Sequence, residues 1–242
     1  MTEAHKPLPL IEEEKSIFHS ISDIPLYACT ISTDSKEFLV YNIEDNKICA
    51  KIPNPVSFDM TTKGLLCKLN GSQLFYFGGR IQRKKTSGTC LLIDIKAQSV
   101  EILPSGRPRF FANPVYFENF VYIFGGSGGP NWDQAASDKF SLRKKKWKRI
   151  ADLPIPTAQT STVLFERKIL IAGHKLGSIL KYDHYKNSYK SLLEISPTSW
   201  KILFIFKERC YAVTNDLQCY VSEIKNWKIW NYHGIIDGII LS

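Results

Sequence analysis

Apolar residues along this chain occur in short runs that are joined in pairs by polar turns. In residues 65–77, LLCKLNGSQLFYF, two such runs flank Asn70-Gly71, a dipeptide that favours the tightest turn between antiparallel strands. The segments 115–124, 162–172 and 202–213 repeat this scheme with a polar turn between apolar runs. Short runs rich in aromatic and β-branched residues are typical of β-strands. The pattern therefore predicts a series of β-hairpins.

A second kind of hairpin, with a constant internal spacing, occurs five times. In each copy two large side chains stand seven residues apart across a polar tip. The five pairs are Tyr41 and Ile48, Ile93 and Val100, Phe140 and Trp147, Tyr182 and Tyr189, and Tyr220 and Trp227. Together, the two kinds of hairpin predict units of four antiparallel strands in about 45 residues, the size of one propeller blade.

Glycines recur at a fixed interval between the two hairpins. Gly78-Gly79 and Gly125-Gly126 each follow an apolar strand, and 125 − 78 = 47. Ala172-Gly173 occupies the same place after a further 47 residues, and the last copy has Thr214 and Asn215 instead. A phosphate-binding loop would occur once, carry a Lys-Ser/Thr pair and lead into a helix. Neither the pair nor a helical pattern follows, so the glycines are interpreted as part of a repeat.

This repeat resembles the kelch repeat, in which an apolar strand ends in Gly-Gly and is followed by a loop, a Tyr-Asp pair and a tryptophan. The residues that carry the resemblance are Phe77-Gly78-Gly79, Phe124-Gly125-Gly126 with Trp147, and Tyr182-Asp183. The Gly-Gly pair is intact in two units only, and tryptophan fills its position only at Trp147 and Trp227. Because sheets converge on an axis, glycine is expected to permit close backbone approach and positive φ, while the bulky residue fills the gap between sheets.

The resemblance implies an all-β, kelch-type β-propeller over residues 25–242, preceded by a flexible tail at residues 1–24. The first unit lacks an innermost strand, and residues 239–241 form a strand without a hairpin partner. As in the family, we expect this C-terminal strand to close the ring beside residues 26–31. The expected ring has five four-stranded blades.

The amino-acid composition indicates the class of protein and the compartment in which we expect it. Hydrophobic residues make up 44% and charged residues 23%, as in ordinary soluble proteins. No apolar run could span a bilayer, and the polar N-terminus lacks a signal-peptide core. The six cysteines form no C-x-x-C pair, so we expect buried, reduced thiols in a cytoplasmic or nuclear protein.

The net charge of +9 raises the question of a polyanionic partner. The two basic clusters, residues 80–85 and 143–149, are predicted on opposite faces of the ring, whereas duplex DNA needs one contiguous stripe. The segment RKKKWKR could serve as a nuclear localisation signal, but we favour a solvated hairpin tip with Trp147 turned inward. RNA or polyanion binding is the weakest of the alternatives considered.

Little in the sequence indicates catalysis. His174 and His184 flank one predicted strand and lie too far apart to share a metal ion. No nucleophile elbow is present. Some kelch-like propellers are enzymes, so a sugar- or small-molecule-processing activity remains the alternative to a non-enzymatic protein–protein interaction module. We expect no catalytic residues, cofactor or metal.

The predicted binding surface consists of the loops between the second and third strands and between successive blades. The distance from the glycine position to the second hairpin is 14 residues in two units, nine in the third and six in the last, and binding loops vary on a rigid frame. Arginine and aromatic residues gather in these loops, which suits an acidic peptide. The predicted contact residues are Arg80, Arg83, Lys84, Arg107, Arg109, Phe110, Trp132, His174 and Trp200.

The partner expected from the resemblance is another protein. Kelch rings often act as ubiquitin-ligase adaptors, and about 24 residues before the first blade are too few for an adaptor segment. A ubiquitin-ligase or cytoskeletal role would therefore act through a separate subunit. We expect no membrane partner, and the separated basic clusters disfavour nucleic acid.

Overall fold

The structure, a computed structural model, describes residues 27–31, 37–42, 47–55, 64–82, 85–128, 133–194, 200–206, 209–223 and 231–235. All regular elements in these ranges are β-strands, and none of the described residues forms a helix that could cross a membrane.

The strands form five larger antiparallel sheets and one small hairpin. Sheet I contains β1 (Tyr27–Ile31), β2 (Glu37–Asn42) and β3 (Lys47–Pro53). Sheet II contains β4 (Leu65–Lys68), β5 (Gln73–Phe77), β8 (Cys90–Asp94) and β9 (Ser99–Leu103). Sheet III contains β10 (Val115–Phe117), β11 (Phe120–Phe124), β12 (Ser137–Ser141) and β13 (Lys146–Ile150). Sheet IV contains β14 (Ser161–Phe165), β15 (Lys168–Ala172), β16 (Ser178–Asp183) and β17 (Ser188–Glu194). Sheet V contains β18 (Trp200–Phe206), β19 (Arg209–Thr214), β20 (Gln218–Glu223) and β21 (Asn231–Ile235). The small hairpin is β6 (Arg80–Gln82) with β7 (Lys85–Thr86).

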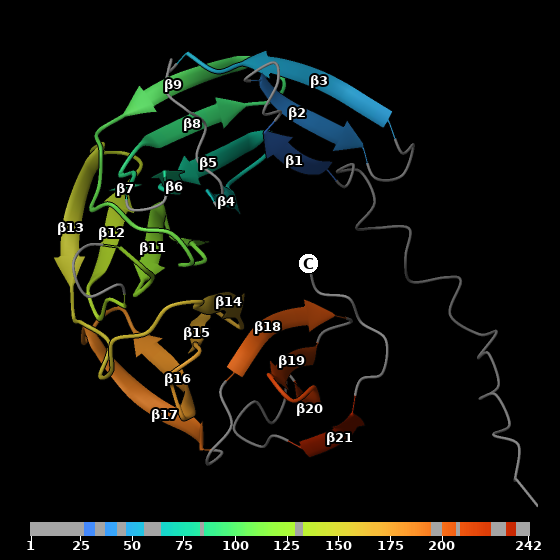
Figure 1. The fold of residues 1–242 in the computed structure, drawn as a ribbon, viewed down its shortest axis with the longest axis vertical. Helices are drawn as coiled ribbons and strands as arrows, with labels where there is room; N and C mark the ends of the chain where they lie inside the picture. Colours follow the sequence, from blue (N-terminus) through green and yellow to red (C-terminus); the bar gives the residue numbers. More distant parts are fainter. Residues whose placement is uncertain are drawn as a thin grey trace, which may run out of the picture.

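The sheets follow one another around a common axis (Figure 1). The first strands of sheets II, IV and V lie innermost, and β9, β13, β17 and β21 lie outermost. The first strand of sheet III, β10, contacts both β4 and β14, and β14 in turn contacts β18. The protein is therefore an all-β propeller, as the sequence predicts.

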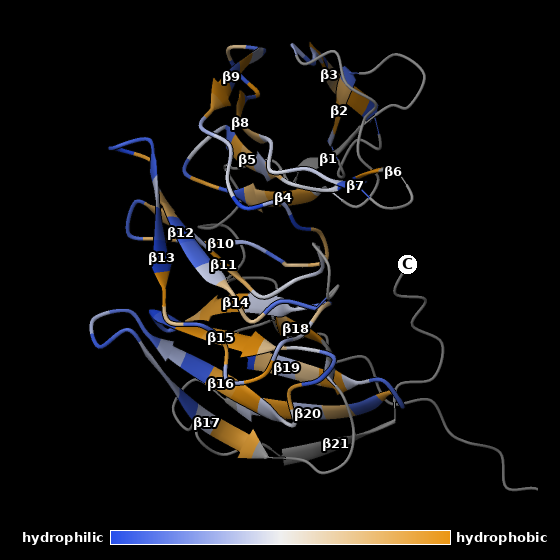
Figure 2. Cartoon of the chain, turned by 60° about the vertical axis from the view of Figure 1, so that its left-hand side comes forward, coloured by the Kyte–Doolittle hydropathy of each residue, from blue (hydrophilic) through white to orange (hydrophobic). Residues whose placement is uncertain are grey.

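The hydrophobic core is divided among the interfaces between consecutive sheets. Four buried clusters occupy the interfaces I–II, II–III, III–IV and IV–V. Middle strands are apolar on both faces because a sheet lies against each side, as in the orange β15 (Figure 2). The outermost β13 is largely blue and carries exposed lysines, which discourage edge-to-edge association with another sheet.

The seven-residue spacing marks cross-strand partners in four of the five sheets. The pairs Tyr41–Ile48, Ile93–Val100, Phe140–Trp147 and Tyr182–Tyr189 lie directly opposite each other in the register. For these hairpins the prediction is confirmed.

The prediction is wrong in sheet V, where Tyr220 pairs with Tyr232 and not with Trp227. The physical reason is the length of the connection, because β20 ends at Glu223 and β21 begins only at Asn231. Trp227 lies outside the described residues.

Two further predictions fall on residues that the structure does not describe. The N-terminal tail, residues 1–24, and the closing strand, residues 239–241, both lie outside the described ranges. Sheet I contains three described strands, with β1 as the innermost of them (Figure 1).

Candidate functional site

The paired glycines allow each sheet to meet the loop that leads into the next sheet. Gly78 and Gly125 have φ values of 69° and 60°, in the left-handed region that glycine tolerates. A Cβ at Gly125 would lie 2.7 Å from the carbonyl oxygen of Thr157, and one at Gly78 would collide with the carbonyl oxygen of Arg109. These glycines therefore allow the backbones of neighbouring units to approach closely.

Arg109 is a buried link between sheets II and III. Its side chain is fully buried, forms an ion pair with Asp138, and donates hydrogen bonds to the carbonyl oxygens of Gly125 at 2.9 Å and Ala136 at 2.7 Å. Arg107 reaches the same carboxylate from the surface, with 3.3 Å between its Nε and Oδ2 of Asp138. Burial lowers the pKa of Arg109 to about 10, although the charge of Asp138 acts in the opposite direction.

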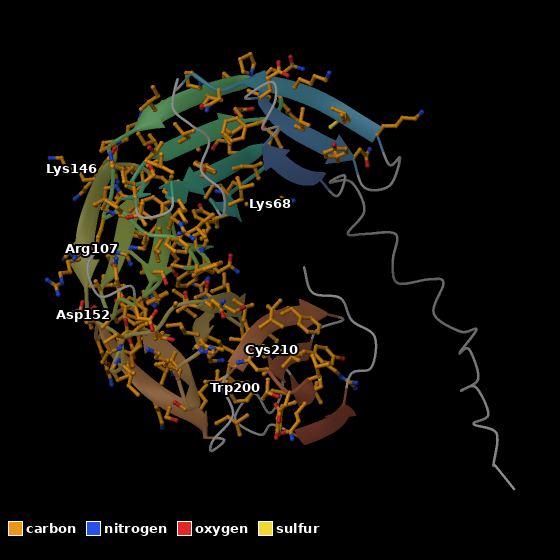
Figure 3. The ribbon with its side chains drawn as sticks, in the orientation of Figure 1. Lys68, Arg107, Lys146, Asp152, Trp200 and Cys210 are labelled. Carbon is orange, nitrogen blue, oxygen red and sulfur yellow. The ribbon has the colours of Figure 1, made fainter. Side chains whose placement is uncertain are left out.

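Three of the predicted contact residues are therefore not on the surface. Arg109, Phe110 and Trp200 have exposed fractions of 0%, 2% and 1%, so the expectation that they present their side chains to a partner is wrong. The backbone of Phe110 pairs with that of Ser127, in the loop that follows β11. Trp200 lies in the cluster between sheets IV and V (Figure 3).

The loops at one end of the propeller form a continuous layer that we call the loop face. It comprises the described residues of segments 78–89, 104–114, 125–136, 151–160, 173–177 and 215–217. Lys175 Nζ lies 2.6 Å from Asp133 Oδ2 and so ties the loop of sheet IV to that of sheet III. His174 Nδ1 lies 3.3 Å from Asn215 Nδ2 and joins the loops of sheets IV and V. The loop face is thus braced by contacts between neighbouring units.

The remaining predicted contact residues divide into two groups. Arg80, Arg107 and His174 lie on the loop face, and the Arg80 guanidinium stands 5.9 Å from the centre of the Phe110 ring. Arg83, Lys84 and Trp132 lie outside the described residues.

Two residues in the loops that join successive sheets were not found by sequence reasoning. Phe111 and Gln159 have φ values of 56° and 51°, in the left-handed region that large side chains rarely adopt. They occupy equivalent places in consecutive loops, since 159 − 111 = 48, and Thr160 N donates a hydrogen bond to the carbonyl oxygen of Phe111. Strain of this kind gathers at functional sites, so both residues are candidate contacts. No feature of their residue types signals this conformation.

The opposite end, the turn face, carries the turns between first and second strands and between third and fourth strands. The basic segment 143–149 is exposed there except for Trp147, whose ring centre lies 5.0 Å from those of Phe77 and Phe140. The indole N–H of Trp147 donates to the carbonyl oxygen of Pro104 at 2.8 Å. Trp147 is therefore turned inward, as predicted for a solvated hairpin tip.

Tyr189 in sheet IV occupies the position equivalent to that of Trp147 in sheet III and packs in a similar way. Its hydroxyl donates a hydrogen bond of 2.6 Å to the carbonyl oxygen of Ala151, and its ring packs on Tyr182. Asp183, beside Tyr182, accepts hydrogen bonds from the backbone N–H groups of Tyr185 and Lys186. These bonds lower the pKa of Asp183 and fix the turn. The Tyr-Asp pair is structural.

An open cavity of about 450 Å³ lies where the innermost strands of four sheets converge. Its walls come from β4, β10, β14 and β18 and from residues just before β10. Lys68, at the end of β4 and labelled in Figure 3, is one of the lining residues. The sequence did not indicate the cavity, because it forms only when inner strands from four repeats meet.

The histidines and acidic residues that the structure describes do not gather into one metal centre. No group of three or more His, Cys, Asp or Glu side chains that could hold a metal ion occurs among them. His174 lies on the loop face, while the ring of His184 packs edge-on against Phe117, 5.0 Å between centres, and lies near Glu118 on the turn face. The two histidines therefore belong to different faces.

Comparison with known proteins shows the fold. No family model matches the chain, and no curated protein matches it either. In contrast, 1048 chains of solved structures match, so the architecture is widespread and does not by itself indicate a function. One of them, described as "Structure of YjhT", has a TM-score of 0.61 and 13% sequence identity, covering 78% of this chain and 69% of that one. At 13% identity this structural similarity concerns the fold, which is that of a β-propeller.

Proposed function

We propose that this protein is a five-bladed, kelch-type propeller that binds a protein partner through its loop face, inside the cell and without catalysing a reaction. The observation that carries the proposal is the bracing of the loops. Loops from four sheets contact one another through Phe110–Ser127, Lys175–Asp133 and His174–Asn215. A binding surface that is already rigid loses little conformational entropy when a partner docks.

The five-blade arrangement is supported by the second face of sheet V. Ile202 and Phe204 lie opposite Val213 and Tyr211 in the register, and the rings of Phe204 and Tyr211 stack at 5.1 Å. This face points away from the cluster that packs on sheet IV, which includes Leu203. A sheet that is apolar on both faces requires a neighbour on both sides. Packing against sheet I would complete a ring, with residues 239–241 as its fourth strand.

The chemistry of the loop face suits an acidic peptide with some apolar contacts. Arg107 keeps 42% of its side chain exposed while Asp138 holds it in place. Ile155, between two exposed prolines, is 46% exposed on the neighbouring loop. An arginine held in place by an ion pair and an exposed apolar side chain, on loops of the same face, are residue types found in interaction hot spots.

The test compares two pairs of exposed residues on opposite faces. Lys85→Glu with Ile155→Glu changes the loop face, and Lys144→Glu with Lys186→Glu changes the turn face; all four side chains are exposed. We expect partners recovered from native lysate with the wild-type protein to be lost with the first pair and retained with the second. Equal melting temperatures would show that both double variants are folded. Loss of binding with the second pair alone would show that the partner uses the turn face.

A further inference from the structure

The open cavity between the innermost strands has the size of a ligand site, and its lining is about half polar and half apolar. Its volume of about 450 Å³ falls in the range of small-molecule pockets, roughly 300–1,000 Å³. Leu66, Val163, Leu164 and Phe204 provide apolar walls from three different sheets. We propose that this cavity binds a small amphipathic carboxylic acid, with Lys68 holding the carboxylate and the apolar side chains contacting the rest of the molecule.

The charge of the residues that line the cavity indicates the charge of the ligand that it would bind. Lys68 is the one charged side chain among the described residues that line it. Lys68 is exposed, and its ammonium group has no ion-pair or hydrogen-bond partner among the described residues. Burial raises the pKa of the neighbouring Cys67 thiol to about 12, so this thiol is neutral and does not offset the lysine. A lone ammonium group at an open cavity whose lining is about half apolar favours an anion with an apolar part.

A single positive charge also distinguishes between kinds of anion. A carboxylate carries one negative charge and is matched by one lysine. A phosphate monoester carries about 1.5 to 2 negative charges at neutral pH and would remain partly uncompensated. A monocarboxylate is therefore the better match.

Polar groups near the other end of the lining are held in place by the fold. Thr162 Oγ1 donates a hydrogen bond of 2.6 Å to the carbonyl oxygen of Asn113, which joins β14 to the segment before β10. The exposed side-chain amide of Asn113 has no hydrogen-bond partner among the described residues. Asn113 lies just before β10, whereas Lys68 is the last residue of β4. The two polar side chains therefore lie toward opposite ends of the cavity, with apolar residues between them.

The residue that would hold the carboxylate lies away from the loop face, although Asn113 and Pro114 belong both to that face and to the cavity lining. Lys68 comes from the end of β4 that leads into the Asn70-Gly71 turn, on the turn face. Substitution of Lys68 can therefore remove acid binding without changing the loop face.

The experiment uses a fluorinated acid as a probe of the full chain. 8,8,8-Trifluorooctanoate and the neutral 8,8,8-trifluorooctan-1-ol are titrated separately, and binding is followed by ¹⁹F NMR. The variants are Lys68→Met, which keeps the apolar stem and removes the charge, and Val163→Trp, which fills the cavity. Lys190→Met, on the outermost strand of sheet IV, is the matched control.

We expect saturable binding of one acid per wild-type chain. Lys68→Met should weaken binding of the acid about tenfold, because one charge-assisted hydrogen bond is lost, and leave the alcohol within about twofold. Val163→Trp should weaken both probes, and Lys190→Met neither. The proposal is overturned if the acid shows no saturable binding, or if Lys68→Met behaves like Lys190→Met. It is also overturned if Lys68→Met weakens acid and alcohol equally.

Discussion

Replacement of Arg109 by methionine tests whether a buried ion pair holds sheets II and III together. Methionine keeps much of the apolar volume of the side chain and removes its charge and all of its hydrogen-bond donors. Asp138 then loses its buried partner, and the carbonyl oxygens of Gly125 and Ala136 lose their donors.

The expected cost follows from what the substitution leaves behind. Removing one member of a buried ion pair typically costs about 3–5 kcal/mol, since the remaining charge is uncompensated. Arg107 stays 3.3 Å from Asp138 and is partly exposed, so it compensates only in part. We therefore expect Arg109→Met to lower the free energy of unfolding by about 3 kcal/mol, near the lower end of this range. For a chain of this length that lowers the melting temperature by about 6–12 °C.

Urea unfolding followed by tryptophan fluorescence measures this loss. A double-mutant cycle with Asp138→Asn should show that the two substitutions are strongly coupled, because the partner charge is then also absent. Lys145→Met is the control, since its exposed ion pair with Glu101 should contribute only about 0–1 kcal/mol. If Arg109→Met costs no more than Lys145→Met, the view of Arg109 as an anchor is refuted.

Four further predictions concern the frame. Gly78→Ala should cost at least twice as much stability as Gly71→Ala in thermal melts, because both have positive φ but only Gly78 faces a backbone carbonyl. Cys49 should react with a thiol reagent before Cys67, Cys90, Cys210 and Cys219, because it is exposed while burial raises the thiol pKa of these four; faster labelling of any of the four than of Cys49 would contradict this. Hydrogen bonds to the carboxylate of Asp94, above all the one from the backbone N–H of Ala97, lower its pKa below 3.8. The carboxylate therefore stabilises the fold above that pH, and this stabilisation is lost as the pH falls below it. In Asp94→Asn the melting temperature should fall less steeply in acid. Deletion of residues 236–242 should abolish the cooperative melt if they close the ring, and an unchanged melt would exclude closure.

Local structure follows from the sequence because its causes lie close together along the chain. Asn70-Gly71 determines a tight turn whatever surrounds it, and Gly71 adopts a φ of 57° there. The seven-residue spacing of Phe140 and Trp147 sets which side chains face each other across a short turn. The same argument failed for Tyr220, where the connection to the next strand is longer and local geometry no longer sets the register.

The candidate sites depended on contacts between units, which the sequence does not display. Arg109 and Phe110 belong to a polar, loop-like segment that indicates a surface, yet the loop is covered by the next sheet. The carbonyl oxygens that hold Arg109 come from Gly125 and Ala136, and no pattern along the chain brings these groups together. In the same way, the cavity beside Lys68 exists only where inner strands of four sheets meet. Hydrogen bonding within a hairpin is decided by neighbouring residues, whereas burial and cavities are decided by how whole sheets pack, and only the tertiary structure decides that packing.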